Sequence, residues 1–322
     1  MSQPEPFPVE LLTPPDPARL PLPPAAPAAP GAQVLRGAVY DIPEGSRPLE
    51  VDLWLPAETA DPVPVIVFVH GGAWRTGLRD DLGPRFRDWR PGPFARLVRS
   101  GFAVACPDYR LSGEVTHPGQ LRDLRAALTW LHARSAELRL DMARTVLWGE
   151  SAGGHLAALL ALTAGSLPVR GCVTWYAPTD LTRLAEDQPE GVYDPSDPGT
   201  FEALLIGGAL TDLPDRAREA SPVSHVAPDA PPFLVLHGTD DVIVPHAQAE
   251  RLVTALHRAG VSAELVSVRG GNHLWAGIED EDVERCFNAS LGFTASLDLA
   301  ARRVDAADRE RDGEGSGHGG RG

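Results

Sequence analysis

Short apolar runs that alternate with helical segments constrain the fold of this chain most. Runs such as VIVFV at 65–69 and FLVLH at 233–237 are bounded by turn formers, and 119–138 carries leucines at helical spacing. Such alternation is typical of the α/β class, with a mostly parallel central sheet of about eight strands covered by helices on both faces. The expected strands are 36–42, 49–55, 65–69, 102–106, 145–149, 171–176, 233–237 and 263–268, and the expected helices are 119–138, 152–164, 246–259 and 279–290.

The first two expected strands, joined by the turn PEGSRP, predict an antiparallel edge. Residues 1–33 are crowded with proline and have no apolar periodicity, which predicts a flexible leader. Residues 301–322 mix charge with glycine and predict a disordered tail. Between them, 34–300 is expected to form one catalytic domain. Within it, 180–225 interrupts the alternation with many Pro, Asp and Gly residues and predicts a small lid above the sheet.

Charge and composition exclude several kinds of partner. The chain has 44 acidic residues against 29 basic ones, a net charge of −15, which disfavours nucleic acid and anionic membrane surfaces. The first residues lack the basic and apolar regions of a secretory signal, and no run approaches a membrane span. We therefore expect a cytoplasmic protein with no membrane partner. Three widely spaced cysteines, Cys106, Cys172 and Cys286, suggest buried core residues rather than a disulfide framework or a metal site.

The pentapeptide GESAG at 149–153 lies between an apolar strand and an apolar helix. This is the context of the G-x-S-x-G nucleophile elbow, in which a sharp turn holds the serine in a strained conformation. Side chains at 149 and 153 are expected to collide with the neighbouring strand and helix. Ser151 is therefore the candidate nucleophile. The alternative is a glycine-rich helix start with a capping serine.

A serine hydroxyl needs a histidine base, and in this fold class the order along the chain is Ser, acid, His. Four histidines lie late enough in the chain. His318 lies in the tail, His257 on an exposed helix face, and His246 at a helix start that disfavours an imidazolium. His273 lies in the glycine-flanked loop RGGNHLW after an expected strand, and it is the candidate base. A histidine that only hydrogen-bonds within its turn is the alternative.

The acid is expected in HGTDDVIVP, directly after the strand at 233–237. This loop offers Asp240 and Asp241, and their spacing does not separate them. The loop HGGAW at 70–74 also follows a strand, so its backbone N–H groups can converge on a developing negative charge. We expect the amides of Gly72, Ala73 and Ala152 to form an oxyanion hole.

These motifs together resemble one known family. HGGAW, D-YRL at 108–111, GESAGGHLAALLAL, ASPVSHV at 220–226, HGTDDVIVP and GGNH occur in the order and spacing seen in esterases of the α/β-hydrolase fold. The resemblance covers roughly 34–292 and is closest to the branch related to hormone-sensitive lipase, with its acetyl and feruloyl esterases and kynurenine formamidases. It implies that Asp241 is the acid. One departure is HGGAW, where lipase-like members often have HGGG and a large amino-terminal cap. This departure favours small or aromatic acyl esters over long-chain lipids.

The sequence thus predicts a serine carboxylesterase with a small-molecule ester substrate and no metal or organic cofactor. Trp74 and Tyr176 follow strand ends and are expected to line the substrate pocket, with core packing as the alternative. Two other functions stay open. HGGAW resembles the HGGxW of arylformamidases that act on N-formylkynurenine, and a non-catalytic receptor for a small ligand can share the scaffold.

Overall fold

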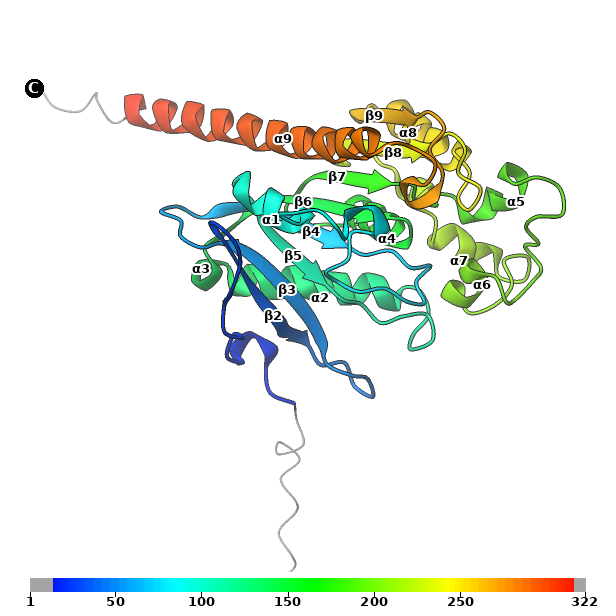
Figure 1. The fold of residues 1–322 in the computed structure, drawn as a ribbon, viewed down its shortest axis with the longest axis horizontal. Helices are drawn as coiled ribbons and strands as arrows, with labels where there is room; N and C mark the ends of the chain where they lie inside the picture. The colour runs from blue at the N-terminus through cyan, green and yellow to red at the C-terminus, as the bar shows by residue number, and fades with distance from the viewer. Residues whose placement is uncertain (1–13, 316–322) are drawn as a thin grey trace, which may run out of the picture.

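A computed structural model describes residues 14–315, with side chains as far as 297. Its centre is a nine-stranded sheet in the order β1-β2-β3-β5-β4-β6-β7-β8-β9 (Figure 1). Strands β4 to β9 are parallel, and β1, β2 and β3 form an antiparallel edge. The predicted α/β class, the eight expected strands and their antiparallel edge are confirmed. The strands are β1 Ala26–Ala29, β2 Ala32–Asp41, β3 Leu49–Pro56, β4 Val63–Val69, β5 Ala103–Pro107, β6 Leu140–Glu150, β7 Val169–Trp175, β8 Phe233–Gly238 and β9 Ala263–Val268.

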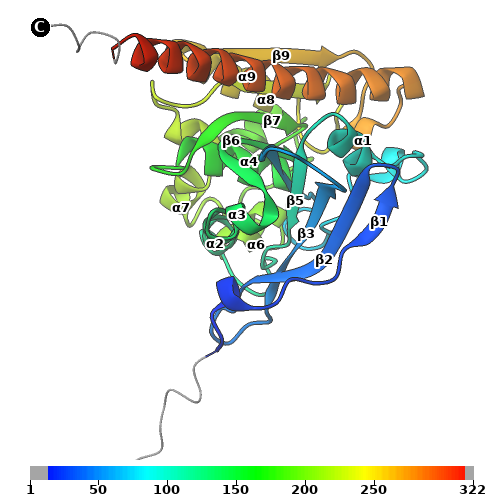
Figure 2. The ribbon, with the colours of Figure 1, turned by 90° about the vertical axis from the view of Figure 1, so that its left-hand side faces the viewer.

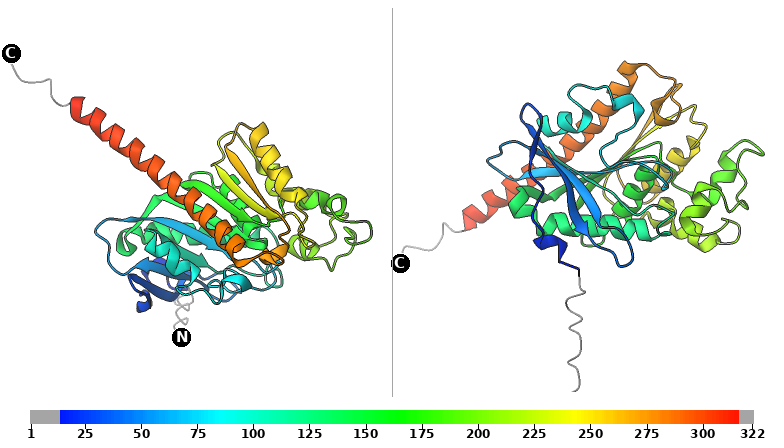
Figure 3. Two further views of the ribbon diagram at one scale, coloured as in Figure 1. Left: turned by 45° about the horizontal axis from the view of Figure 1, so that its top comes forward. Right: turned by 60° about the horizontal axis from the view of Figure 1, so that its bottom comes forward.

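Helices cover both faces of the sheet because successive strand residues point to opposite sides. In β4, Val65, Val67 and Val69 join one apolar cluster, which also contains residues of α2, α4 and α8. Ile66 and Phe68 join a second cluster with residues of α1 and α9. Figure 3 shows α9, in orange and red, running along one face of the sheet. The helices are α1 Pro93–Arg99, α2 Gly119–Ala133, α3 Ser135–Leu138, α4 Ala152–Leu162, α8 Ala247–Arg258 and α9 Asp280–Gly315.

The segment expected as a flexible leader contains ordered structure from residue 14 onward. Strand β1 pairs antiparallel with β2 at the sheet edge (Figure 2). A 3-10 turn, η2 (Pro17–Arg19), precedes it, and the indole of Trp130 donates a hydrogen bond to the Pro17 carbonyl (3.1 Å). Proline removes a backbone donor but keeps its acceptor, so a proline-rich segment can occupy an edge position. Residues 1–13 lie outside the described part of the chain.

Part of the segment expected to be a disordered tail is helical instead, because α9 continues to Gly315. Residues 299–311 are rich in Ala and Arg, which have high helix propensity, and this outweighs their low hydrophobicity. Figure 1 shows the end of α9 extending past the sheet. Residues 316–322 lie outside the described part of the chain. Among residues 14–315, no helix is both long and apolar enough to cross a membrane.

Between β7 and β8 the chain leaves the sheet and forms short helices over 180–225, which we call the insertion. Figure 1 shows its helices beyond the end toward which the β7 arrow points. Because the elbow and the loops after β8 and β9 lie at that same end of the parallel strands, the insertion is placed beside them. Its elements are η4 Leu181–Arg183, α5 Leu184–Asp187, α6 Phe201–Ile206, α7 Pro214–Glu219 and η5 Pro222–His225.

Candidate active site

The turn between β6 and α4 presents Ser151 in a strained conformation, with φ 52° and ψ −123°. Both flanking glycines are required by space. A Cβ at Gly149 would overlap the carbonyl oxygen of Gly153 in α4, and a Cβ at Gly153 would overlap that of Val69 in β4. Larger residues at either position would force the strand and the helix apart. The sequence pattern therefore produces the local geometry of a nucleophile elbow.

Hydrogen bonds connect Ser151 to two residues that are distant in sequence. The Nε2 atom of His273 lies 2.9 Å from Ser151 Oγ, and its Nδ1 atom lies 2.8 Å from Asp241 Oδ2. His273 opens the 3-10 turn η6 (His273–Trp275), a few residues after β9, and Asp241 follows β8. An ionised Asp241 accepts a hydrogen bond from the Nδ1–H of His273, which leaves the Nε2 lone pair facing the serine hydroxyl.

Asp241 is fixed as a carboxylate by its surroundings. Its Oδ1 accepts hydrogen bonds from the backbone N–H groups of Ile243 (2.9 Å) and Val244 (2.8 Å). Burial raises the pKa of Asp241, but hydrogen bonds from His237 and His273 outweigh burial and hold the pKa below its usual value. The other candidate acid, Asp240, is exposed and accepts a hydrogen bond from the Thr239 hydroxyl (2.8 Å). Of the two aspartates, the structure brings only Asp241 to His273.

Gly72, Ala73 and Ala152 line the same cavity as Ser151. Gly72 has φ 111°, and a Cβ there would overlap the Thr76 carbonyl. Within the described residues, none of these three N–H groups donates to another protein group. Backbone donors that are free in the wall of this cavity can stabilise a negative oxygen that forms there.

Glu150, which the sequence analysis did not single out, lies below this loop. It is buried, and its Oε1 accepts a hydrogen bond from the Gly71 N–H (2.7 Å). Burial raises the pKa of Glu150 to about 7, against the opposing effect of the Gly71 hydrogen bond. The residue before the serine thus holds the first turn of the HGGAW loop. The sequence signal for this role was an acidic residue directly before the elbow serine, at the end of an apolar strand.

Trp74 and Tyr176 have different positions. Trp74 lines the cavity, and its indole N–H donates to Nδ1 of the buried His155 (3.2 Å). Tyr176 is not among the cavity-lining residues, because its ring packs behind His273 and against Trp275, with centroids 4.8 Å apart in each pair. Tyr176 therefore supports His273 from the core side. It does not line the cavity, contrary to the expectation from the sequence.

His155 connects the HGGAW loop to the insertion. Its Nε2 donates to the carbonyl of Ala220 (2.6 Å), and burial lowers its pKa to about 3, so the ring is neutral. His237, at the end of β8, is also buried, and its Nε2 donates to the Val244 carbonyl (2.7 Å) in the turn that holds Asp241. Sequence reasoning missed both histidines. Their roles depend on distant backbone carbonyls that local patterns do not reveal.

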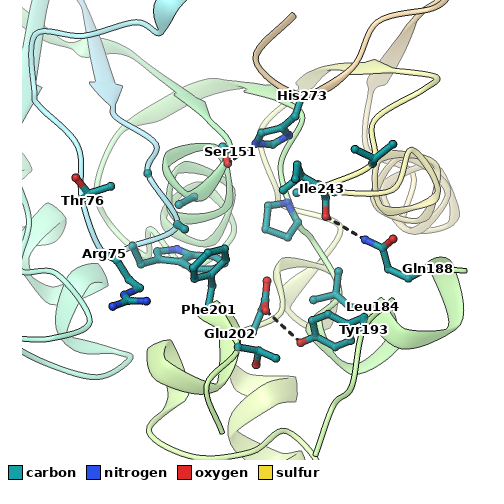
Figure 4. Close-up of a pocket in the computed structure, with 18 of the residues that line it drawn as sticks. Arg75, Thr76, Ser151, Leu184, Gln188, Tyr193, Phe201, Glu202, Ile243 and His273 are labelled. Carbon is teal, nitrogen blue, oxygen red and sulfur yellow. Dashed lines mark hydrogen bonds between the residues drawn. The ribbon is translucent and has the colours of Figure 1, made fainter. Parts of the chain in front are cut away.

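The cavity that contains Ser151 and His273 has a volume of about 830 Å³ (Figure 4). Most of its wall is apolar, and the insertion contributes much of it. Six large apolar side chains are strongly exposed in the described part of the chain, and five of them line this cavity: Val192, Phe201, Val242, Ile243 and Leu274. Apolar groups that are exposed together around a cavity indicate that they contact an apolar ligand.

Over 14–315, no group of three or more His, Cys, Asp or Glu side chains could hold a metal ion. Cys106, Cys172 and Cys286 are buried and unpaired, as expected from their spacing.

Comparisons with known proteins connect this geometry to a family. The BD-FAE family model matches residues 51–256. Esterase LipQ of Mycobacterium tuberculosis is 30% identical over 287 residues, which cover 83% of this chain and 65% of LipQ. The probable carboxylic ester hydrolase LipM of the same organism is 31% identical over 228 residues, which cover 67% of this chain and 50% of LipM. The chain thus spans about half to two thirds of the length of these relatives.

Solved structures show the same fold. A truncated carbohydrate esterase from gut microbiota superposes with a TM-score of 0.69 at 26% identity, covering 82% of this chain and 95% of that one. Est2, an esterase of Thermogutta terrifontis in its propionate-bound form, gives a TM-score of 0.65 at 24% identity, covering 83% and 95%. The family match takes in β3 through α8, with the elbow, the HGGAW loop and Asp241. The fold is therefore the α/β-hydrolase fold, and the chain belongs to the BD-FAE family.

Proposed function

We propose that this protein is a serine carboxylesterase that hydrolyses small or aromatic acyl esters through a Ser151–His273–Asp241 triad. The observation that carries the proposal is the continuous chain of hydrogen bonds, 2.9 Å from serine to histidine and 2.8 Å from histidine to aspartate. The relatives named as esterases support the same reaction class.

In the proposed reaction, Ser151 Oγ attacks the ester carbonyl carbon while His273 Nε2 accepts the hydroxyl proton. The carbonyl oxygen becomes negative and accepts hydrogen bonds from the amides of Gly72, Ala73 and Ala152. Asp241 stabilises the imidazolium that forms. The C–O bond to the alcohol then breaks, and the alcohol oxygen takes the proton from His273. Water, deprotonated by the same histidine, hydrolyses the acyl-enzyme and regenerates the serine.

The cavity supports the proposed acyl group. Its volume of about 830 Å³ accommodates a compact ester. The rings of Trp74, Tyr193 and Phe201 line it, and they can pack against an aromatic acyl group. Est2, which has the same fold, has been solved with propionate and with butyrate bound. These observations favour short and aromatic acyl groups over long alkyl chains.

The test is a comparison of the purified protein with its Ser151→Ala variant on p-nitrophenyl acetate, butyrate, octanoate and benzoate. We expect kcat to fall by roughly 10³ or more in the variant. We also expect kcat/KM to be higher for butyrate and benzoate than for octanoate. A fluorophosphonate probe should label the protein but not the variant. If Ser151→Ala keeps most of the turnover, the assignment of the nucleophile is wrong.

The same assay separates the esterase from the two alternatives, an arylformamidase and a non-catalytic receptor. N-formyl anilides, offered beside the acetyl esters, test formamidase activity. A receptor on this scaffold should neither turn over esters nor react with the probe.

A further inference from the structure

One acidic side chain lies in the mostly apolar wall of the active-site cavity. Glu202, in the first turn of α6, lines the cavity, and its Oε2 accepts a hydrogen bond from the Tyr193 hydroxyl (3.1 Å). Figure 4 shows its carboxylate pointing into the cavity, across from Ser151 and His273. The insertion therefore places a carboxyl group in the wall of the cavity that also contains Ser151 and His273.

Glu202 lacks a cationic partner in the described part of the chain. No arginine or histidine there forms an ion pair with it, including Arg75, which also lines the cavity. Burial raises the pKa of Glu202, and hydrogen bonds from its own N–H and from Tyr193 offset only part of this effect. A partly buried carboxylate with so few donors is under-satisfied, and a ligand donor can remove part of the desolvation cost.

Two other polar side chains that the insertion contributes to the wall form hydrogen bonds within the protein. The Gln188 amide donates to the Ile243 carbonyl (3.1 Å), and the Thr200 hydroxyl accepts the N–H of Ala203 at the start of α6 (3.2 Å). Among the described residues that the insertion contributes to the cavity wall, Glu202 is thus the only charged acceptor.

We propose that Glu202 is a specificity-determining residue, and that the preferred esters carry a hydroxyl or ammonium group that donates a hydrogen bond to it while the ester carbonyl lies at Ser151. This inference rests on the proposed esterase function and deepens it. The apolar wall holds the body of the substrate. Glu202 then discriminates between substrates that carry a hydrogen-bond donor and those that do not. A hydrogen bond to a charged acceptor corresponds to about ten- to hundred-fold in kcat/KM. A carbon isostere of the donor leaves the carboxylate unpaired and is rejected by a similar factor.

The experiment measures kcat/KM within three isosteric pairs of esters. On the alcohol side, 3-hydroxypropyl acetate is compared with n-butyl acetate, and 2-(dimethylamino)ethyl acetate with 3-methylbutyl acetate. On the acyl side, ethyl 3-(4-hydroxyphenyl)propanoate is compared with its 4-methyl analogue. In each pair a donor replaces a methyl or methine group of similar size. We expect the donor to be preferred by about tenfold or more in at least one pair.

Variants then assign that preference. Glu202→Ala should bring the ratio of the selected pair close to one. Glu202→Gln keeps an acceptor without charge, so it should retain most of a hydroxyl preference but lose most of an ammonium preference. Glu190→Ala, an exposed glutamate of the same insertion that does not line the cavity, should leave the ratio unchanged. Tyr193→Phe should also preserve the preference, because it removes only a competing donor.

A purely structural role for Glu202 predicts another pattern. Glu202→Ala and Tyr193→Phe would then lower kcat/KM equally for both members of every pair, with no change in ratio, and the inference would be overturned. Ratios near one in all three pairs for the unmodified protein would also overturn it, while leaving ester hydrolysis intact. Failure of the proposed function is a different result, because then no ester in the panel is hydrolysed.

Discussion

Asp241→Asn is predicted to abolish most esterase activity by reversing one hydrogen bond. The Asn Oδ1 can keep the two backbone N–H groups of Ile243 and Val244, now 2.9 and 2.8 Å from Asp241 Oδ1. Its NH₂ group then replaces the oxygen that lies 2.8 Å from His273 Nδ1. Because an NH₂ group only donates, Nδ1 must accept, and the ring proton moves to Nε2. His273 then offers Ser151 a donor instead of a base.

The magnitude follows from two losses. A carboxylate and an imidazolium about 4 Å apart attract by roughly 4 kcal/mol at an effective dielectric constant of 20, which equals about three powers of ten in rate. The wrong tautomer adds to this loss, so we expect kcat to fall about 10³ to 10⁴-fold, as in other enzymes with this triad. The assay is p-nitrophenyl butyrate hydrolysis at pH 8, with circular dichroism to show that the fold is retained.

Asp240→Asn is the matched control, since Asp240 is adjacent in sequence and exposed. Its side chain accepts only the Thr239 hydroxyl, and an Asn oxygen can keep that bond. We expect its kcat to stay within about twofold of the unmodified protein. If Asp240→Asn loses activity and Asp241→Asn keeps it, the assignment of the acid is refuted.

Three further predictions concern stability. Folding raises the pKa of Glu150 from an ordinary 4.5 to about 7. The stability that its protonated side chain contributes is therefore fully present below pH 4.5 and is lost as the pH rises through 7. The unfolding free energy relative to Glu150→Gln should thus fall by about 3 kcal/mol between pH 4 and pH 8 in urea titrations, and a flat difference would contradict this. Gly153→Ala, by overlap with the Val69 carbonyl, should cost about 1–3 kcal/mol or prevent folding, measured by thermal melting; an unchanged Tm would contradict the steric argument. Trp74→Phe leaves buried Nδ1 of His155 without its donor and should cost about 1–3 kcal/mol in urea titrations, whereas a neutral result would show that water replaces the indole.

The strands, the elbow and the loops after β8 and β9 could be predicted because their signals are local. Apolar runs and turn residues mark each strand end, and parallel strands bring their carboxyl ends to one edge. Asp240 and Asp241 could not be separated by spacing, since both lie in one turn and only its backbone geometry decides which carboxylate points to His273. The resemblance to known esterases resolved that choice.

The remaining features depend on contacts between distant segments. Tyr176 follows a strand end as expected, but it has φ 37° and its ring packs against Trp275, away from the cavity. The ordered part of the leader depends on pairing with β2 and on a carbonyl that meets Trp130. The pair of Tyr193 and Glu202 joins two parts of an irregular insertion, for which periodicity gives no signal.

The separation of the triad residues on the sheet from the cavity wall on the insertion has a consequence for how proteins of this family can change. Ser151, His273 and Asp241 are anchored at strand ends, where the two apolar clusters oppose any shift. Phe201 and Glu202 belong to a segment that contributes no strand to that sheet. Substitutions between β7 and β8, or a change in the length of that segment, can therefore alter the cavity wall while Ser151, His273 and Asp241 keep their positions. Diversification of substrate choice in such proteins should concentrate in that stretch of chain.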